Sequence, residues 1–172
     1  KHFLINPFGL HYTEVRASNL VKIDVHGNPV GRSDWPANPA GFTIHSTLHE
    51  GIPEAVCVMH THTTAGTAVA CLRDGLSMSS FYAFQLHGRV AYHDFEGITL
   101  YADEGPRLLK SIGDKQAVIL RNHGLLSWGR TIAQAFNVLY LLERACQQQV
   151  VTLPLGPVIV PDESIQAKCA RD

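Results

Sequence analysis

Long apolar runs, an excess of charge and cysteine motifs are all missing from this sequence. No apolar stretch approaches the roughly 20 residues that a membrane-spanning helix requires, so no membrane partner is expected. Charged residues make up 17% of the chain, and its formal net charge is −1. Because no Lys/Arg cluster exceeds a couple of residues, nucleic acid and anionic membranes are poor candidates as partners.

Cysteine usage indicates a reducing, cytoplasmic setting. Cys57, Cys71, Cys146 and Cys169 show no Cys-x-x-Cys spacing. Cys57 and Cys71 stand in apolar surroundings that are typical of buried, reduced thiols. The 172 residues fit one domain over residues 1–172. Since the chain begins abruptly at Lys1 with no signal peptide, we expect a further N-terminal segment upstream.

Two histidine motifs close apolar segments and are the most informative feature that is present. His60-Thr61-His62 follows an apolar run, and Asn122-His123-Gly124 follows another at residues 117–120. Side chains two apart in a strand point to the same face, so His60 and His62 can converge on one ion. A third imidazole from a separate strand end would leave a coordination position open, as a catalytic metal needs. Ligands in α/β proteins collect at the carboxyl ends of strands, which favours this interpretation over three unrelated histidines.

Strand and helix signals alternate along the chain. Apolar alternation and turn residues predict strands, whereas apolar residues at helical spacing and capping residues predict helices. Thr131 with Gln134 forms a predicted capping box, and the apolar residues from Ile132 to Val150 repeat at helical spacing. The predicted strands are Phe3–Asn6, Leu20–Val25, Ala55–His60, Arg89–Tyr92 and Ile98–Tyr101, and the predicted helices are Gly41–Glu50, Thr64–Leu72, one from Asp103 to Gly113 and one from Thr131 to Val150.

Four stretches, taken in order, carry a resemblance to a known family. Gly41–Ser46, Pro53–Thr63, Tyr92–Asp94 and Leu120–Leu125 resemble the class II aldolase/adducin family, and within it the adducin-like branch. The resemblance implies a three-layer α/β/α fold with a central, mostly antiparallel sheet, assembled as a homotetramer or other homo-oligomer. It also implies a divalent metal, zinc above manganese, iron or cobalt, held by the residues that here are His60, His62 and His123.

The sequence departs from the sugar-phosphate aldolases of that family. Aligned through Pro53 and His60, the position of their catalytic glutamate falls on Gly41, and their preceding serine pair falls on Pro39 and Ala40. Glycine cannot transfer a proton, which disfavours aldol cleavage of a sugar phosphate. Decarboxylation fits better, because loss of carbon dioxide creates an enolate that afterwards needs only a proton donor.

The candidate proton donors are Tyr82, Tyr92, His93, Asp94 and Glu50. A carboxylate next to an imidazole can orient or charge it, which singles out His93 and Asp94. Tyr82 belongs to the aromatic segment Phe81–Phe84, which is predicted to anchor a subunit contact, with ordinary core packing as the alternative. In the first case Tyr82 would project toward the metal of a neighbouring subunit. Arg121 and Asn122 either bind a substrate carboxylate or hold the loop around His123.

These observations predict a metal-dependent lyase that acts on a carbon-carbon bond next to a carbonyl in a small keto or hydroxy acid. The alternative is a non-catalytic, adducin-like assembly domain of the cytoskeletal type, since retained histidines do not prove an enzyme. The absence of a long charged tail beyond Asp172 speaks against that alternative. Metal-dependent hydrolysis ranks last, because no His-Glu-x-x-His motif supplies a base.

Overall fold

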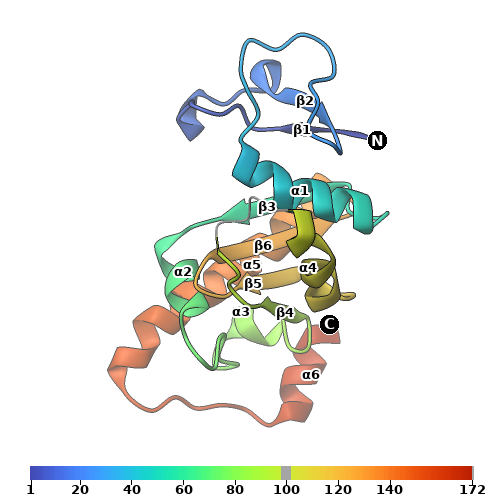
Figure 1. The fold of residues 1–172 in the computed structure, drawn as a ribbon. Helices are drawn as coiled ribbons and strands as arrows, with labels where there is room; N and C mark the ends of the chain where they lie inside the picture. The colour runs from blue at the N-terminus through green and yellow to red at the C-terminus, as the bar shows by residue number, and fades with distance from the viewer. Residues whose placement is uncertain (98–101, 172) are drawn as a thin grey trace. The chain divides into compact units, whose positions relative to one another are not determined.

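The computed structural model describes residues 1–97 and 102–171. By its internal contacts the chain divides into two compact units (Figure 1). Unit 1 comprises Lys1–Ala55 and Glu96–Leu109, and unit 2 comprises Val56–Phe95 and Lys110–Asp172. The predicted strand Ile98–Tyr101 lies outside the described residues. One domain over residues 1–172 stays a prediction.

Unit 1 contains a two-stranded antiparallel sheet. β1 (His2–Ile5) pairs with β2 (Val21–Asp24), with Phe3 opposite Ile23. The alternation of both strands places Phe3, Ile5, Val21 and Ile23 in one buried cluster, as a period of two predicts. Two short 3-10 helices, η1 (Tyr12–Glu14) and η2 (Ala17–Asn19), lie between the strands along the chain.

The helices of unit 1 follow from clear local signals. α1 (Pro39–Gly51) begins at a proline, whose missing N–H costs nothing at the first helical position. Ile44 and Leu48 lie one turn apart and are buried, which confirms the predicted face of this helix. η3 (Ala102–Glu104) leads into α4 (Gly105–Ile112), whose residues 105–109 belong to unit 1 and 110–112 to unit 2.

The half-buried imidazole of His45 in α1 predicts that acid destabilises the protein. Burial, followed by the charge of His49, lowers the pKa of His45 from 6.5 to about 4. Between these values the unfolded chain binds a proton that the folded chain does not, so the free energy of unfolding falls as the pH drops through this window. We expect this group to contribute a loss of about 2 kcal/mol between pH 7 and pH 5.

Urea unfolding at both pH values checks this, and His45→Gln should reduce the difference by about the contribution of this group. His49 and His123, whose pKa values burial also lowers, keep their own contributions. The exposed His26 provides the control variant His26→Gln, which should keep the pH dependence of the parent. An unchanged pH dependence in His45→Gln would show that another group is responsible.

Unit 2 is built on a four-stranded mixed sheet with the order β3-β6-β5-β4. The strands are β3 (Cys57–Thr61), β6 (Gly124–Gly129), β5 (Ala117–Leu120) and β4 (Val90–His93). β6 pairs antiparallel with both β3 and β5, whereas β4 and β5 are parallel. Every residue of β5 and β6 is buried, as expected for central strands covered on both faces.

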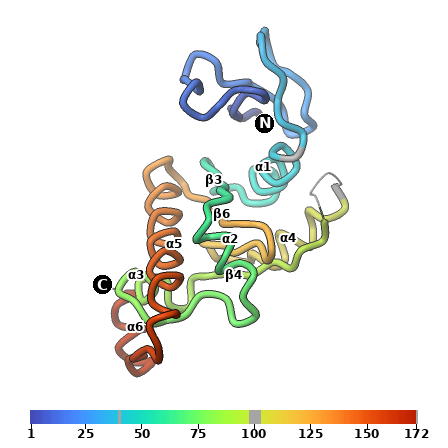
Figure 2. Tube along the Cα trace, turned by 90° about the vertical axis from the view of Figure 1, so that its left-hand side faces the viewer, coloured from blue at the N-terminus to red at the C-terminus, as the bar shows by residue number. Residues whose placement is uncertain are grey.

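A long helix covers one face of this sheet. α5 (Ile132–Thr152) packs along β6 and β3, and Figure 2 shows it beside these strands. Thr131 caps it by accepting a hydrogen bond from the Gln134 N–H at 3.1 Å, as predicted. The Gln134 side chain accepts from the backbone N–H of Arg130, one residue before the cap, and not from that of Thr131, so the reciprocal half of the predicted capping box is wrong. The remaining helices of unit 2 are α2 (Thr64–Ala70), α3 (Phe81–Phe84), η4 (Leu153–Leu155) and α6 (Glu163–Arg171).

Two details of the predicted core are wrong. Cys71 is exposed, because it is the C-cap of α2, and Cys57 is half-buried, whereas Cys146 on α5 is fully buried. Ile132 and Phe136 fit the helical period of α5, yet they are 70% and 59% exposed. The period alone does not tell how wide a stripe of the helix the sheet covers.

Among the described residues, no helix is long and apolar enough to cross a membrane.

Candidate metal centre

Two of the three histidines come from β3 and the residue that follows it. His60 lies opposite Leu126 of β6, and His62 comes directly after the end of the strand at Thr61. The Nδ1 atom of His60 lies 2.8 Å from the carbonyl oxygen of Leu125, to which an Nδ1–H can donate. Because one ring nitrogen is used in this way, Nε2 keeps its lone pair and can act as a metal ligand.

The third histidine lies in the short turn between β5 and β6. Leu120 pairs with Gly124, and the N–H of His123 donates to the Leu120 carbonyl at 3.1 Å. Asn122 has a φ of 56°. Asparagine tolerates this left-handed conformation better than most residues, which gives a backbone reason for its place in the motif. The turn thereby presents the imidazole of His123 toward the end of β3.

The three imidazoles converge. Their nearest ligand atoms all lie within 4.8 Å of one another, and the Nε2 atoms of His60 and His62 are 2.8 Å apart. Two nitrogens bound to one tetrahedral zinc at about 2.1 Å are about 3.4 Å apart, so small movements of the rings would accommodate the ion. Three neutral nitrogen donors suit zinc and other divalent transition metals. The donor set therefore fits the predicted metal.

The electrostatics of the cluster keep one imidazole neutral. Burial, followed by the proximity of His62, lowers the pKa of His123. A lowered pKa leaves the ring unprotonated near neutral pH, and metal binding requires this form. His62 is exposed, whereas His60 and His123 are half-buried, so the cluster is open to solvent on the side of His62.

Gly124 allows the close approach of the turn to β3. A Cβ atom added at Gly124 would lie 2.4 Å from the Thr61 carbonyl oxygen and 3.0 Å from Cδ2 of His62. It would also lie 3.4 Å from Cε1 of His60. Any larger residue must therefore push apart the chain segments that carry the three histidines, which explains why glycine follows His123.

A hydrogen bond from a distant helix supports the loop behind His62. The Thr63 hydroxyl donates to a carboxylate oxygen of Glu143 on α5 at 2.5 Å and accepts from the Gly66 N–H at 3.2 Å. Thr63 thus caps α2, and its two hydrogen bonds hold the backbone next to His62 in place. Phe95 approaches His123 edge-on, with 6.4 Å between the ring centroids. Sequence reasoning missed Gly124, Glu143 and Phe95, because their roles depend on contacts between residues far apart in the chain.

His93 and Asp94 lie at the end of β4 but do not interact in the predicted way. His93 is 5% exposed, and its Nδ1 lies 3.0 Å from the Ser111 hydroxyl. The Asp94 carboxylate lies 3.5 Å from Nε of Arg121. Asp94 therefore faces Arg121 and not His93, as expected where neighbouring side chains of an extended chain point to opposite sides. The catalytic role of either residue stays a prediction.

The guanidinium group of Arg121, which precedes the turn that carries His123, contacts the segment after α2 and the ring of Tyr92. Nη1 donates to the carbonyls of Leu72 and Arg73 at 3.1 and 3.2 Å, and the group lies 4.6 Å from the centroid of the Tyr92 ring. These contacts favour the second of its two predicted roles, which is to fix the loop around His123. Binding of a carboxylate by Arg121, and by the side chain of Asn122, stays a prediction.

Tyr82 belongs to α3 and faces α5 within the same chain. Its ring packs edge-on to Tyr140 at 6.4 Å, and the guanidinium of Arg144 lies 5.4 Å from its centroid. The half-buried ring also packs against the main core of unit 2, and its neighbour Phe81 is 68% exposed. The predicted contact of this segment with a neighbouring subunit stays a prediction.

Sequence comparisons identify relatives of two kinds. The family described as "Class II Aldolase and Adducin N-terminal domain" matches residues 1–150. A Caulobacter vibrioides protein that is named for the class 2 aldolases is 44% identical over 155 residues, covering 90% of this chain and 60% of that protein. Alpha-adducin of Rattus norvegicus is 46% identical over 156 residues, covering 89% of this chain and 21% of that protein. The chain thus spans less than two thirds of the length of either relative.

Solved structures share the fold. An aldolase II superfamily protein from Pseudomonas syringae superposes with a TM-score of 0.94 at 42% identity, covering 99% of this chain and 70% of that one. L-fuculose 1-phosphate aldolase from Glaciozyma antarctica superposes with a TM-score of 0.87 at 32% identity, covering 99% and 66%. These similarities and the mixed sheet confirm the predicted α/β class, with three α/β/α layers and a mostly antiparallel central sheet.

Proposed function

The chain belongs to the class II aldolase and adducin family, and on that premise we propose that it is a metal-dependent lyase. The substrate is a small keto or hydroxy acid in which a carbon-carbon bond next to a carbonyl is broken. The observation that carries this proposal is the convergence of His60, His62 and His123, whose ligand atoms lie within 4.8 Å of one another.

These three residues would hold the divalent ion, with zinc preferred to manganese, iron or cobalt. When bound, the ion supplies a positive charge that polarises a substrate carbonyl together with a neighbouring hydroxyl oxygen. The chain's own part is to present three neutral nitrogens and to leave an open side at the exposed His62. Tyr82, His93 and Asp94 are the candidate proton donors, and Arg121 and Asn122 are the candidate carboxylate contacts.

Phosphorylated sugars are expected to be poor substrates. The third residue of α1 is Gly41, at the position where the sugar-phosphate aldolases carry their glutamate. General acid and base groups contribute about 100-fold or more to rates, so kcat/KM for L-fuculose 1-phosphate should be at least about 100-fold below that of such aldolases. Efficient cleavage of this compound would contradict the expectation and would indicate a base from another segment.

A substrate panel tests the function itself. The full chain, loaded with zinc or manganese, is incubated with 2-keto acids and hydroxylated aromatic acids, and release of carbon dioxide or aldehyde is followed by NMR. Turnover should disappear in His60→Ala and persist in His87→Ala, a histidine of unit 2 whose Nε2 lies 3.9 Å from Glu163. Turnover that survives in His60→Ala would show that the histidine cluster does not carry the reaction.

A non-catalytic assembly domain is the second candidate function. The observation in its favour is the 46% identity to alpha-adducin, which exceeds the 44% identity to the Caulobacter vibrioides protein. A chain that binds one metal ion, turns over no member of the panel and co-sediments with filamentous actin would support this candidate instead. Self-assembly into a homotetramer or other homo-oligomer is part of both candidates, and sedimentation velocity would measure it.

A further inference from the structure

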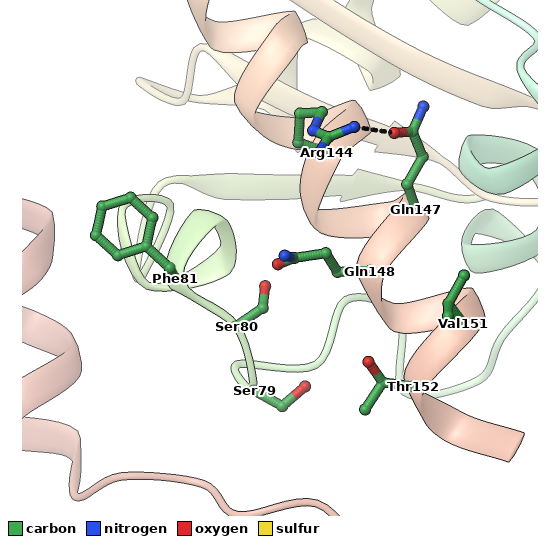
Figure 3. A pocket seen from close by; sticks show the side chains of 8 residues that line it. All are labelled: Ser79, Ser80, Phe81, Arg144, Gln147, Gln148, Val151 and Thr152. Atoms are coloured by element: carbon green, nitrogen blue, oxygen red, sulfur yellow. Dashed lines mark hydrogen bonds between the residues drawn. The ribbon is translucent and has the colours of Figure 1, made fainter. Parts of the chain in front are cut away.

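Unit 2 carries a cavity whose lining includes none of the three histidines. It has a volume of about 590 Å³ and lies between the segment that leads into α3 and the second half of α5 (Figure 3). Six of its eight lining residues are polar or charged, which is unlike an empty apolar void. The lining residues are Ser79, Ser80, Phe81, Arg144, Gln147, Gln148, Val151 and Thr152.

Arg144 is the single charged residue of the lining, and its positive charge is not neutralised by an ion pair among the described residues. Nη1 donates to the Gln147 side-chain oxygen at 2.9 Å, which Figure 3 shows as a dashed line. Its buried Nε has no hydrogen-bond partner. The neighbouring carboxylate of Glu143 instead accepts hydrogen bonds from Thr63 and Gln147. The Nε–H of Arg144 therefore lacks a partner within the chain, and an anion could bind it once the side chain turns away from the Tyr82 ring.

Gln148 adds an unpaired acceptor one helical turn further along α5. Its side-chain oxygen is buried and has no hydrogen-bond partner among the described residues. Residues four apart lie on the same face of a helix, so the side chains of Arg144 and Gln148 line the same cavity, while the unpaired atoms themselves are covered. Ser80 accepts from the Ala83 N–H at 3.3 Å, and its own O–H can donate into the cavity. Buried polar atoms without partners are rare in folded proteins, so each calls for a partner from outside the chain, such as water or a ligand group.

We propose that this cavity binds a small oxyanion that also carries an O–H or N–H group, with a hydroxycarboxylate as the ligand class. The carboxylate pairs with the Arg144 fork and with a serine hydroxyl, and the ligand's own hydroxyl donates to Gln148. Phe81 and Val151 contact the carbon skeleton. Both unpaired atoms are covered in the free chain, so the flexible side chains of Arg144 and Gln148 turn toward the ligand when it enters.

NMR titration of the metal-free full chain tests the site, because removal of the metal prevents anions from binding at the histidine cluster. The Nε–Hε resonance of Arg144 is followed while lactate, acetate or inorganic phosphate is added. Lactate should shift it saturably with a Kd of about 1 mM or lower. Acetate, which lacks the hydroxyl that donates to Gln148, should bind about 10-fold more weakly, as the loss of one hydrogen bond predicts. Phosphate that binds more tightly than lactate would identify a phosphate compound as the source of the oxyanion.

Three variants locate the binding. Followed by backbone resonances near the cavity, Arg144→Gln should weaken lactate binding at least about 10-fold. Gln148→Met, which keeps the side-chain length, should abolish the preference for lactate over acetate. Arg73→Gln removes the same charge from an exposed residue outside the cavity and should leave the Kd unchanged.

Several outcomes would overturn the proposal. One is the absence of a saturable shift with any probe up to about 50 mM, a concentration far above a millimolar Kd. Another is equal weakening by Arg73→Gln, which would indicate unspecific attraction by charge. A third is dissociation of an oligomer by Arg144→Gln while no probe binds, which would show that a second copy of the chain fills the cavity. If Arg144→Gln does not fold, the lactate preference of Gln148→Met decides.

Discussion

Replacing His123 with alanine is expected to lower the affinity of the chain for zinc by more than about 100-fold. His123 supplies one of three ligand atoms that lie within 4.8 Å of one another, and it comes from a different strand end than His60 and His62. Residues that hydrogen-bond a metal-binding side chain, without binding the metal themselves, contribute about 10- to 100-fold to metal affinity. Loss of a residue that binds the metal directly should therefore cost more. Competition with a chromophoric chelator at pH 7.5 measures the affinity, and elemental analysis gives the number of ions per chain.

The control for this experiment is His87→Ala, which removes an imidazole from unit 2 but not from the cluster. It should bind one zinc ion as tightly as the parent chain. Since the His123 side chain is half-buried, the truncated variant can also lose stability, and circular dichroism of the metal-free proteins separates the two effects. Unchanged zinc affinity in folded His123→Ala would refute the three-histidine site and leave a surface pair of histidines.

The convergence of the histidines could be predicted because it depends on local rules. The side-chain period of two brings His60 and His62 to one face of a strand, and an apolar run marks the strand end before His123. Within the described residues, the boundaries of the predicted strands and helices agree with the structure to within a few residues for the same reason. The strand β6 was not predicted. Its six residues are buried without alternation, and such a run has no period that distinguishes a strand from a buried helix.

The supports of the site could not be predicted, because they are contacts between distant residues. Thr63 and Glu143 are 80 positions apart, and no sequence pattern connects them before α2 and α5 pack against each other. The same holds for the partner of Asp94, which is Arg121 and not the adjacent histidine. The cavity beside Arg144 also forms only where the segment before α3 meets α5.

Gly124→Ala is expected to weaken zinc binding by about 10- to 100-fold although glycine offers no ligand atom. The added methyl group would lie 2.4 Å from the Thr61 carbonyl oxygen, and a backbone atom cannot turn away as a side chain can. The turn and β3 must therefore separate by several tenths of an ångström, which moves His123 away from His60 and His62. The expected loss of zinc affinity is that seen when residues that support metal-binding side chains are changed. The strain should also destabilise the metal-free chain by about 1–3 kcal/mol.

The chain offers a matched control at Gly41 in α1. A Cβ atom there would meet the Asn38 side chain at 3.8 Å, which is ordinary van der Waals contact. Gly41→Ala should therefore keep the zinc affinity of the parent and raise the free energy of unfolding by about 0.5–1 kcal/mol, since alanine is favoured in helices. Chelator competition and urea unfolding of both variants measure the two quantities. If Gly124→Ala binds zinc as tightly as Gly41→Ala, then the three histidines tolerate the separation of the turn from β3, and the close approach at Gly124 serves only the packing of the strands.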